Sequence, residues 1–171
     1  MLDIRKFVLL TSACTLILSG CTTLNPDKKT GYEQELQGQT AIYSWTARGQ
    51  MLFSCAHDEA GFFWRFVRSE GRLSNDAGNS MGKINPDLSI TSTDGSKILL
   101  RPLKAAEAKA PGDLKNLLYA VDSSPQTGIF ARISFVERRN AKGGLPLSKC
   151  SAIQNQQLLH VPFEARYIFW R

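Results

Sequence analysis

The sequence predicts a mainly β domain, an antiparallel β-sandwich or barrel with at most one or two short helices. Two observations carry this prediction. Apolar and polar side chains alternate in several separate segments, and this period of two is typical of strands with one face in a core. Turn residues divide these segments at short intervals, which favours an antiparallel sheet over alternating strands and helices.

The alternating segments and the turns between them can be placed along the chain. The alternation lies at residues 50–55, 62–67, 129–136 and 163–170. Turn signals occur at Arg48-Gly49, Asn75–Gly78, Asp94-Gly95 and Gly143-Gly144. Residues 88–100 are predicted to form a hairpin, because Asp-Gly tolerates the positive φ angles of a type I′ turn.

Two stretches depart from this pattern. In residues 113–121, apolar side chains recur at i, i+3, i+4 and i+7 behind Asp113, a potential N-cap. A helix of two turns fits this spacing, and a short buried strand fits the length equally well. Residues 104–110 have helix propensity but little apolar content, so a loop or a frayed helix is expected there.

Length and composition limit the class of protein. The chain has 171 residues, a net charge of +6 and 43% hydrophobic residues, which excludes a disordered chain and a polytopic membrane protein. The chain is also too short for a (β/α)8 barrel, which needs about 250 residues. The expected organisation is a signal peptide at residues 1–20, a tether at 21–38 and a single β-rich domain at 39–171.

The N-terminus has the pattern of a bacterial export signal. Arg5 and Lys6 precede a short apolar run, which ends in Leu18-Ser-Gly-Cys21. This ending resembles the lipobox, in which the cysteine becomes the lipid-bearing N-terminus of the mature protein. Cys21 is therefore the expected lipid attachment site. Thr22 differs from the Asp that marks retention in the inner membrane, so we expect the outer membrane, facing the periplasm.

The remaining cysteines of the exported domain are Cys55 and Cys150. In an oxidising compartment a lone pair of cysteines usually forms a disulfide. Two free buried thiols and a metal pair are the alternatives. A metal site wants more ligands, and the chain has only two histidines, His57 and His160. We expect a disulfide, no metal and no cofactor.

Two further motifs are candidate sites of chemistry. Gly78–Gly82 matches the G-x-S-x-G nucleophile elbow around Ser80, but no helix is predicted after it, so a tight turn is expected. His57, Asp58 and Glu59 are consecutive and could serve acid–base or metal chemistry. A hydrophilic hairpin loop explains these three residues equally well, and we expect no catalytic residue.

A basic cluster lies around the Gly143-Gly144 turn and contains Arg138, Arg139, Lys142 and Lys149. A solvated face is its expected role. Such a face can also favour anionic partners such as phospholipid headgroups or acidic glycans. Nucleic acid is not an expected partner of a lipidated, exported domain.

Several short motifs together resemble one family. They are residues 47–55, Trp64-Arg-Phe66, residues 73–83, residues 93–97, residues 137–150 and residues 161–169. Their order and spacing are similar to the exported family catalogued as domain of unknown function 3455, over roughly residues 40–170. The resemblance implies the fold, export and the Cys55–Cys150 pairing. That family has no established activity to imply.

The sequence departs from the family pattern at two places. Members usually have a His soon after the Gly-Lys pair and then Gly-Pro-x-Trp. This chain has Ile84 and the segment Asn85-Pro86-Asp87-Leu88 there.

The functional hypothesis is a non-enzymatic, lipid-anchored envelope module that binds a protein, glycan or lipid. The alternatives are a small inhibitor of an envelope or host hydrolase, and a hydrolase that uses His57 with Asp58 or Glu59.

Overall fold

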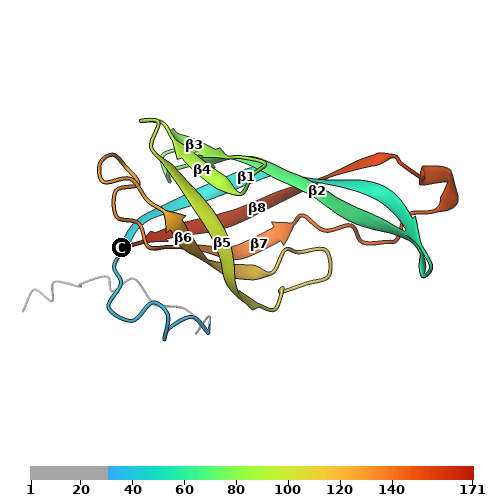
Figure 1. Ribbon diagram of the computed structural model, residues 1–171, viewed down its shortest axis with the longest axis horizontal. Coiled ribbons are helices and arrows are strands. Elements are labelled where there is room, and N and C mark those ends of the chain that lie inside the picture. The colour runs from blue at the N-terminus through green and yellow to red at the C-terminus, as the bar shows by residue number, and fades with distance from the viewer. Residues whose placement is uncertain (1–30) are drawn as a thin grey trace, which may run out of the picture.

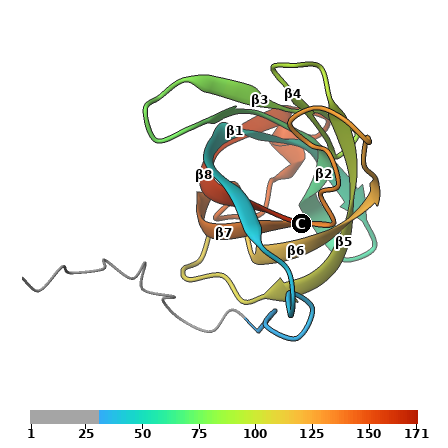
Figure 2. The ribbon, with the colours of Figure 1, turned by 90° about the vertical axis from the view of Figure 1, so that its left-hand side faces the viewer.

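Residues 31–171 are described by the computed structural model, and they form a closed antiparallel barrel of eight strands (Figure 1). Each strand pairs with the next along the chain, and β8 pairs with β1 to complete the ring seen end-on in Figure 2. The strands are β1 (Ala41–Asp58), β2 (Gly61–Ser74), β3 (Ser80–Ile84), β4 (Ser89–Ser92), β5 (Lys97–Ala106), β6 (Asn116–Ser123), β7 (Phe135–Gly143) and β8 (Leu158–Trp170). The mainly β prediction is confirmed, and of its two forms the barrel is present and the sandwich is wrong.

The strands differ greatly in length, and this shapes the molecule. β1 pairs with β2 from Thr46–Ser74 to Asp58–Gly61, whereas β3 reaches only residues 71–74 of β2. The β1–β2 hairpin and the start of β8 therefore project beyond the ring (Figure 1). The barrel has a short, fully ringed end and a long, one-sided end.

Aromatic side chains fill the ringed end. Trp45 lies 4.7 Å from Phe169 and 5.7 Å from Phe130 between ring centroids, and Phe130 stacks on Phe169 at 5.2 Å. Phe130 comes from the β6–β7 connection, which Asp94 holds in place by accepting a hydrogen bond of 2.7 Å from the Ile129 amide. This end of the lumen is closed by packed rings, each of which buries a large apolar area.

Four local predictions need correction. The strand expected at 129–136 starts only at Phe135, because Gly128 and Arg132 have positive φ angles that a strand does not accommodate. Residues 104–106 belong to β5, not to a loop or helix. Gly49 lies within β1, not in a turn. In the β4–β5 hairpin only Gly95, and not Asp94, has a positive φ angle, so the turn is not type I′.

The ambiguous stretch at 113–121 is mostly strand, since β6 begins at Asn116. Its helix-like spacing has a clear cause. Leu117 and Tyr119 face the lumen, while Leu118 between them is fully buried on the outer face. A strand with both faces covered loses the simple alternation of apolar and polar residues. In the described chain the single helical turn is the 3-10 turn η1 (Ala152–Gln154).

The outer face over Leu118 lies next to the segment that precedes β1. Tyr32 is fully buried and its hydroxyl donates a hydrogen bond of 2.8 Å to the Asn116 carbonyl oxygen. Lys104 forms an ion pair of 2.9 Å with Glu35. The last residues of the expected tether thus pack on the barrel. The signal segment and Cys21 lie outside the described residues, and no helix within residues 31–171 could span a membrane.

The disulfide prediction is confirmed. Cys55 of β1 and Cys150 of the β7–β8 connection are bonded, with their Cα atoms 5.9 Å apart. The bond fastens the projecting β1–β2 hairpin to the loop of residues 144–157. It stabilises the long end of the barrel, where ladder pairing is least complete.

Candidate functional site

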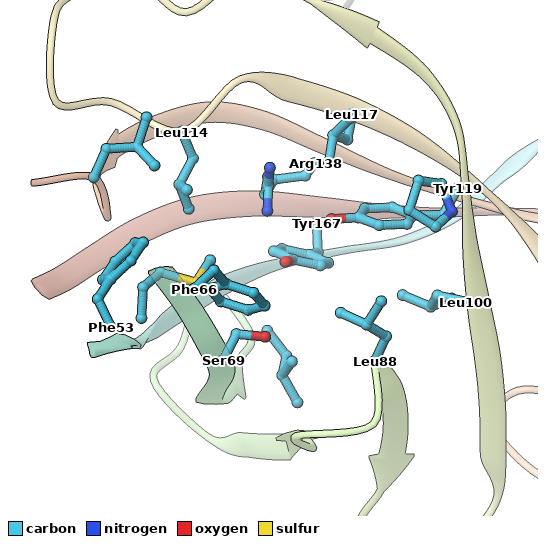
Figure 3. A pocket seen from close by; sticks show the side chains of 14 residues that line it. Phe53, Phe66, Ser69, Leu88, Leu100, Leu114, Leu117, Tyr119, Arg138 and Tyr167 are labelled. Carbon is cyan, nitrogen blue, oxygen red and sulfur yellow. The ribbon is translucent and has the colours of Figure 1, made fainter. Parts of the chain in front are cut away.

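A cavity of about 250 Å³ lies in the lumen, on the side of the projecting hairpin (Figure 3). It is bounded by side chains of seven strands and three connections, so the closed sheet itself builds it. Most of its wall is apolar: Met51, Phe53, Phe66, Ile84, Leu88, Leu100, Pro102, Leu114, Leu117 and Leu145. Protein interiors seldom leave space of this size among apolar side chains.

Four polar side chains complete the wall, namely Ser69, Tyr119, Arg138 and Tyr167. The Arg138 side chain is the charged one. Only 6% of Arg138 is exposed, and its Nε and Nη2 atoms donate hydrogen bonds of 3.2 and 2.9 Å to the Lys115 carbonyl oxygen. Its guanidinium carbon lies 6.0 Å from the centre of the Tyr119 ring, at the limit of a cation–π contact.

The two tyrosines are neutral hydrogen-bonding groups. Burial raises the pKa of Tyr119 and that of Tyr167, although the Arg138 charge opposes the shift in both. Their hydroxyls therefore keep their protons, and Tyr167 is hydrogen-bonded to the Arg138 side chain. The polar part of the wall is therefore one cation, two neutral tyrosine hydroxyls and the Ser69 hydroxyl.

Strand alternation explains why an arginine reaches the lumen. Val136 is a core residue of β7, so Arg138, two residues later, points to the same side. Glu137 between them points to the outer face, where it is fully buried and paired with Arg139. None of the ion pairs formed among residues 31–171 includes Arg138.

Comparison with protein families gives one match. The model of the family described as Protein of unknown function (DUF3455) matches residues 85–171, about half of the chain. This chain belongs to the DUF3455 family. The matched part is shorter than the 40–170 range of the motifs, but it includes Tyr119, Arg138 and Tyr167. No curated protein and no solved structure matches this DUF3455 chain.

The two departures from the DUF3455 sequence pattern acquire a structural meaning. Ile84 and Leu88, at the two places where the sequence departs from the pattern expected for the family, both line the cavity. Leu88 has a φ of 63°, which is uncommon for a side chain of this size. Strained residues of this kind gather at functional sites. In this member of the family, both positions make the wall aliphatic.

The residues singled out as acid–base candidates do not come together. His57 is exposed near the tip of the β1–β2 hairpin and packs 4.6 Å from the Phe62 ring, and Asp58 accepts a hydrogen bond from the Ala60 amide. His160 is paired with Leu52 in the ladder, five residues or about 16 Å along β1 from His57. Its Nδ1 atom lies 2.8 Å from Gln50 Oε1.

The other sequence candidates lie apart from the cavity. Ser80 is exposed at the start of β3, directly after the Asn75–Gly78 turn, and no helix follows it. Among residues 31–171 no group of three or more His, Cys, Asp or Glu side chains is arranged to hold a metal ion.

The prediction of a solvated basic face is correct for only two of its four residues. Lys142 and Lys149 are exposed, but Arg138 is in the lumen and Arg139 is half-buried beside Glu137. The signal that could have revealed Arg138 is its phase with Val136. That signal was hidden because residues 129–136 were expected to form one strand, whereas β7 begins only at Phe135.

Proposed function

We propose that this protein is a lipid-anchored binding module of the bacterial envelope that holds a small apolar molecule in its barrel lumen and catalyses no reaction. The cavity is the observation that carries the proposal. Ligand sites are mostly apolar hollows of about 300–1,000 Å³ with a few polar groups. The lumen has this character and a volume just below that range, which fits a small ligand.

The cavity also has a route of entry. Phe66 and Leu145 line it, and both are exposed to solvent at the projecting end, Phe66 to 51%. Side chains that belong to both the wall and the surface mark the place where a ligand would enter. The opposite end is filled by the Trp45, Phe130 and Phe169 rings, so entry is expected from the hairpin side.

The side chains around the cavity support binding over hydrolysis. General acid–base catalysis needs a group whose pKa lies near the operating pH, within reach of the reacting atom. The lumen offers tyrosines with raised pKa values and an arginine. His57, Asp58 and Glu59 lie at or beside the hairpin tip and are not part of the cavity wall.

A fluorescent probe tests this function. The chain from residue 22 onward contains the whole described barrel, and we expect it to bind the neutral probe N-phenyl-1-naphthylamine with increased fluorescence. Leu88→Trp puts an indole into the cavity where the family usually has one, and it should weaken probe binding at least tenfold. Leu99→Trp is the control, because Leu99 lies on β5 next to Leu100 and is exposed. Absence of probe binding to the unmodified domain would overturn the proposal.

The lipid anchor is a separate part of the proposal and rests on the Leu18–Cys21 motif. Tyr32, which is buried, follows Cys21 by eleven positions, which allows a distance of at most about 40 Å. The barrel would therefore remain close to the membrane. Cys21→Ala should move the protein from the membrane fraction to the soluble fraction or stall its processing. A correctly processed Cys21→Ala protein that stayed in the membrane fraction would contradict the anchor.

The inhibitor alternative has one observation in its favour. The loop of residues 144–157 exposes Leu147 to 82% and Ile153 to 89%, and the Cys55–Cys150 bond braces it. A braced loop loses less conformational entropy when it meets a protein partner. Lysozyme activity measured with excess domain tests this alternative: loss of activity that is restored by Leu147→Ser would favour it.

A further inference from the structure

We infer that the ligand of the lumen is a medium-chain carboxylic acid, with its chain along the apolar wall and its carboxylate on Arg138. The inference rests on the proposed binding function and names the ligand class. Three features carry it: the burial of the Arg138 charge, the absence of an acidic group from the wall, and the size of the cavity.

Arg138 is a buried charge that needs an anion. Moving a charged group out of water is costly, and a buried charge is therefore normally paired. Within residues 31–171 the guanidinium has the Lys115 carbonyl and the Tyr167 hydroxyl as neutral partners and no carboxylate in an ion pair. A carbonyl stabilises a cation less than a carboxylate does. An acidic ligand would complete the pairing.

The hydrogen bonds that the guanidinium makes to Lys115 do not use all of its N–H donors, so it can still bind an acidic ligand. The Lys115 carbonyl takes Nε and Nη2, and Nη1 does not bond to it. The hydroxyls of Tyr119 and Tyr167 lie on the same wall and are hydrogen-bonded to each other, and Figure 3 shows the Arg138 side chain near those of both tyrosines. No Asp or Glu is among the residues that line the cavity. A ligand carboxylate would thus meet donors without a competing anion.

Size and charge narrow the class of acid. One water takes about 30 Å³ in the liquid, so a lumen of about 250 Å³ holds roughly eight groups of this size. A chain of about eight to ten carbons fits, with its end at the open side. The wall provides one positive charge, which balances a carboxylate. A phosphate monoester would bring a second negative charge into the apolar wall, which disfavours it.

The test compares decanoate with 1-decanol, which share a chain and differ in charge. Displacement of N-phenyl-1-naphthylamine is measured on the chain from residue 22 onward, in its unmodified form and as Arg138→Met. Arg101→Met is the matched control, because Arg101 is another strand arginine whose ion pair, with Asp122, is exposed. We expect decanoate to bind about 10- to 100-fold more tightly than decanol, as a charge-assisted hydrogen bond implies. Arg138→Met should abolish that preference and Arg101→Met should keep it.

The outcomes separate this inference from the proposed function. If neither compound displaces the probe and the probe itself does not bind, the binding function fails. If both bind the unmodified domain equally, or if Arg138→Met weakens both by the same factor, the lumen binds apolar molecules and the acid inference is wrong. The ratio of the decanoate affinity to the decanol affinity, measured on the unmodified domain, tests the acid inference even if Arg138→Met does not fold. Tighter binding of decyl phosphate than of decanoate would also overturn the carboxylate assignment.

Discussion

Glu137 and Arg138 are consecutive residues of β7, and both are buried, on opposite faces of the barrel wall. Arg138 lines the lumen, whereas Glu137 lies on the outer face. There the charge of Glu33 contributes to the raised pKa of Glu137, and the charge of Glu137 contributes to the raised pKa of Tyr32. Each side of this one strand therefore carries an ionisable group removed from water. The outer group, Glu137, is paired with Arg139, and the inner group, Arg138, is the proposed ligand contact.

The first prediction concerns stability and pH. Burial raises the pKa of Glu137 above its ordinary 4.5, although the Arg139 charge opposes the shift. The folded protein then holds this proton more tightly than the unfolded chain does. The stabilisation is complete below about pH 4.5 and is lost as the pH rises through the raised pKa. We expect Glu137→Gln to reduce the fall in the free energy of unfolding between pH 4 and pH 7, measured by urea denaturation.

The unmodified protein must be compared with Glu137→Gln, because other carboxyl groups change the stability with pH in the opposite direction. Hydrogen bonds from Ser89 and Lys97 lower the pKa of Asp87 to about 2, so its contribution is lost as the pH falls below about 4. Asp87 is present in both proteins and cancels in the difference. Identical pH profiles for the unmodified protein and Glu137→Gln would contradict the prediction.

The second prediction concerns the segment before β1. Tyr32→Ala removes a fully buried ring and should lower the free energy of unfolding by up to about 3–5 kcal/mol. Tyr32→Phe removes only the hydrogen bond to the Asn116 carbonyl and should cost about 1 kcal/mol. Urea denaturation gives both values, and limited proteolysis reports whether residues 33–40 become cleavable in Tyr32→Ala. Unchanged stability together with unchanged protease resistance would show that this segment contributes nothing.

The third prediction concerns the disulfide. The bond between Cys55 and Cys150 closes a loop with a sequence separation of 95. In the chain-entropy model, loss of a bond across such a loop costs about 4–5 kcal/mol. The Cys55→Ala, Cys150→Ala double variant should therefore unfold at a lower urea concentration. The reduced unmodified protein is the control and should unfold alongside it, and a double variant as stable as the oxidised protein would exclude this role.

The fourth prediction concerns Gly49. A Cβ atom at this position would lie 2.1 Å from the Glu70 carbonyl oxygen and 2.6 Å from the Gly71 Cα atom. Backbone atoms cannot move away cheaply, so Gly49→Ala should cost at least about 1–3 kcal/mol. The nearest contact at Gly71 is longer, 3.1 Å, and Gly71→Ala should be milder. Thermal unfolding of both variants checks the order; equal melting temperatures would refute it.

The sequence predicted the β class, the hairpin around Asp94-Gly95 and the disulfide, because alternation, turn residues and cysteine count are local signals. It did not distinguish a barrel from a sandwich, since closure depends on the pairing of β1 with β8, more than a hundred residues apart. Gly49 lies in a strand and not in the expected turn, because the close approach of two strands selects glycine just as a turn does. The cavity could not be foreseen, because its wall gathers inward side chains from distant strands. Arg138 was visible as a charge, but not as a buried one.

The unequal pairing of β2 has a consequence for self-association. Residues 61–70 of β2 pair with β1 on one side and, within the part of the chain that the structure describes, with no strand on the other. Such a free edge can add a strand from another molecule, and charged side chains on it oppose this. Arg65, Arg68 and Glu70 lie along this stretch. Where copies of the protein meet at high concentration, these charges would oppose joining edge to edge.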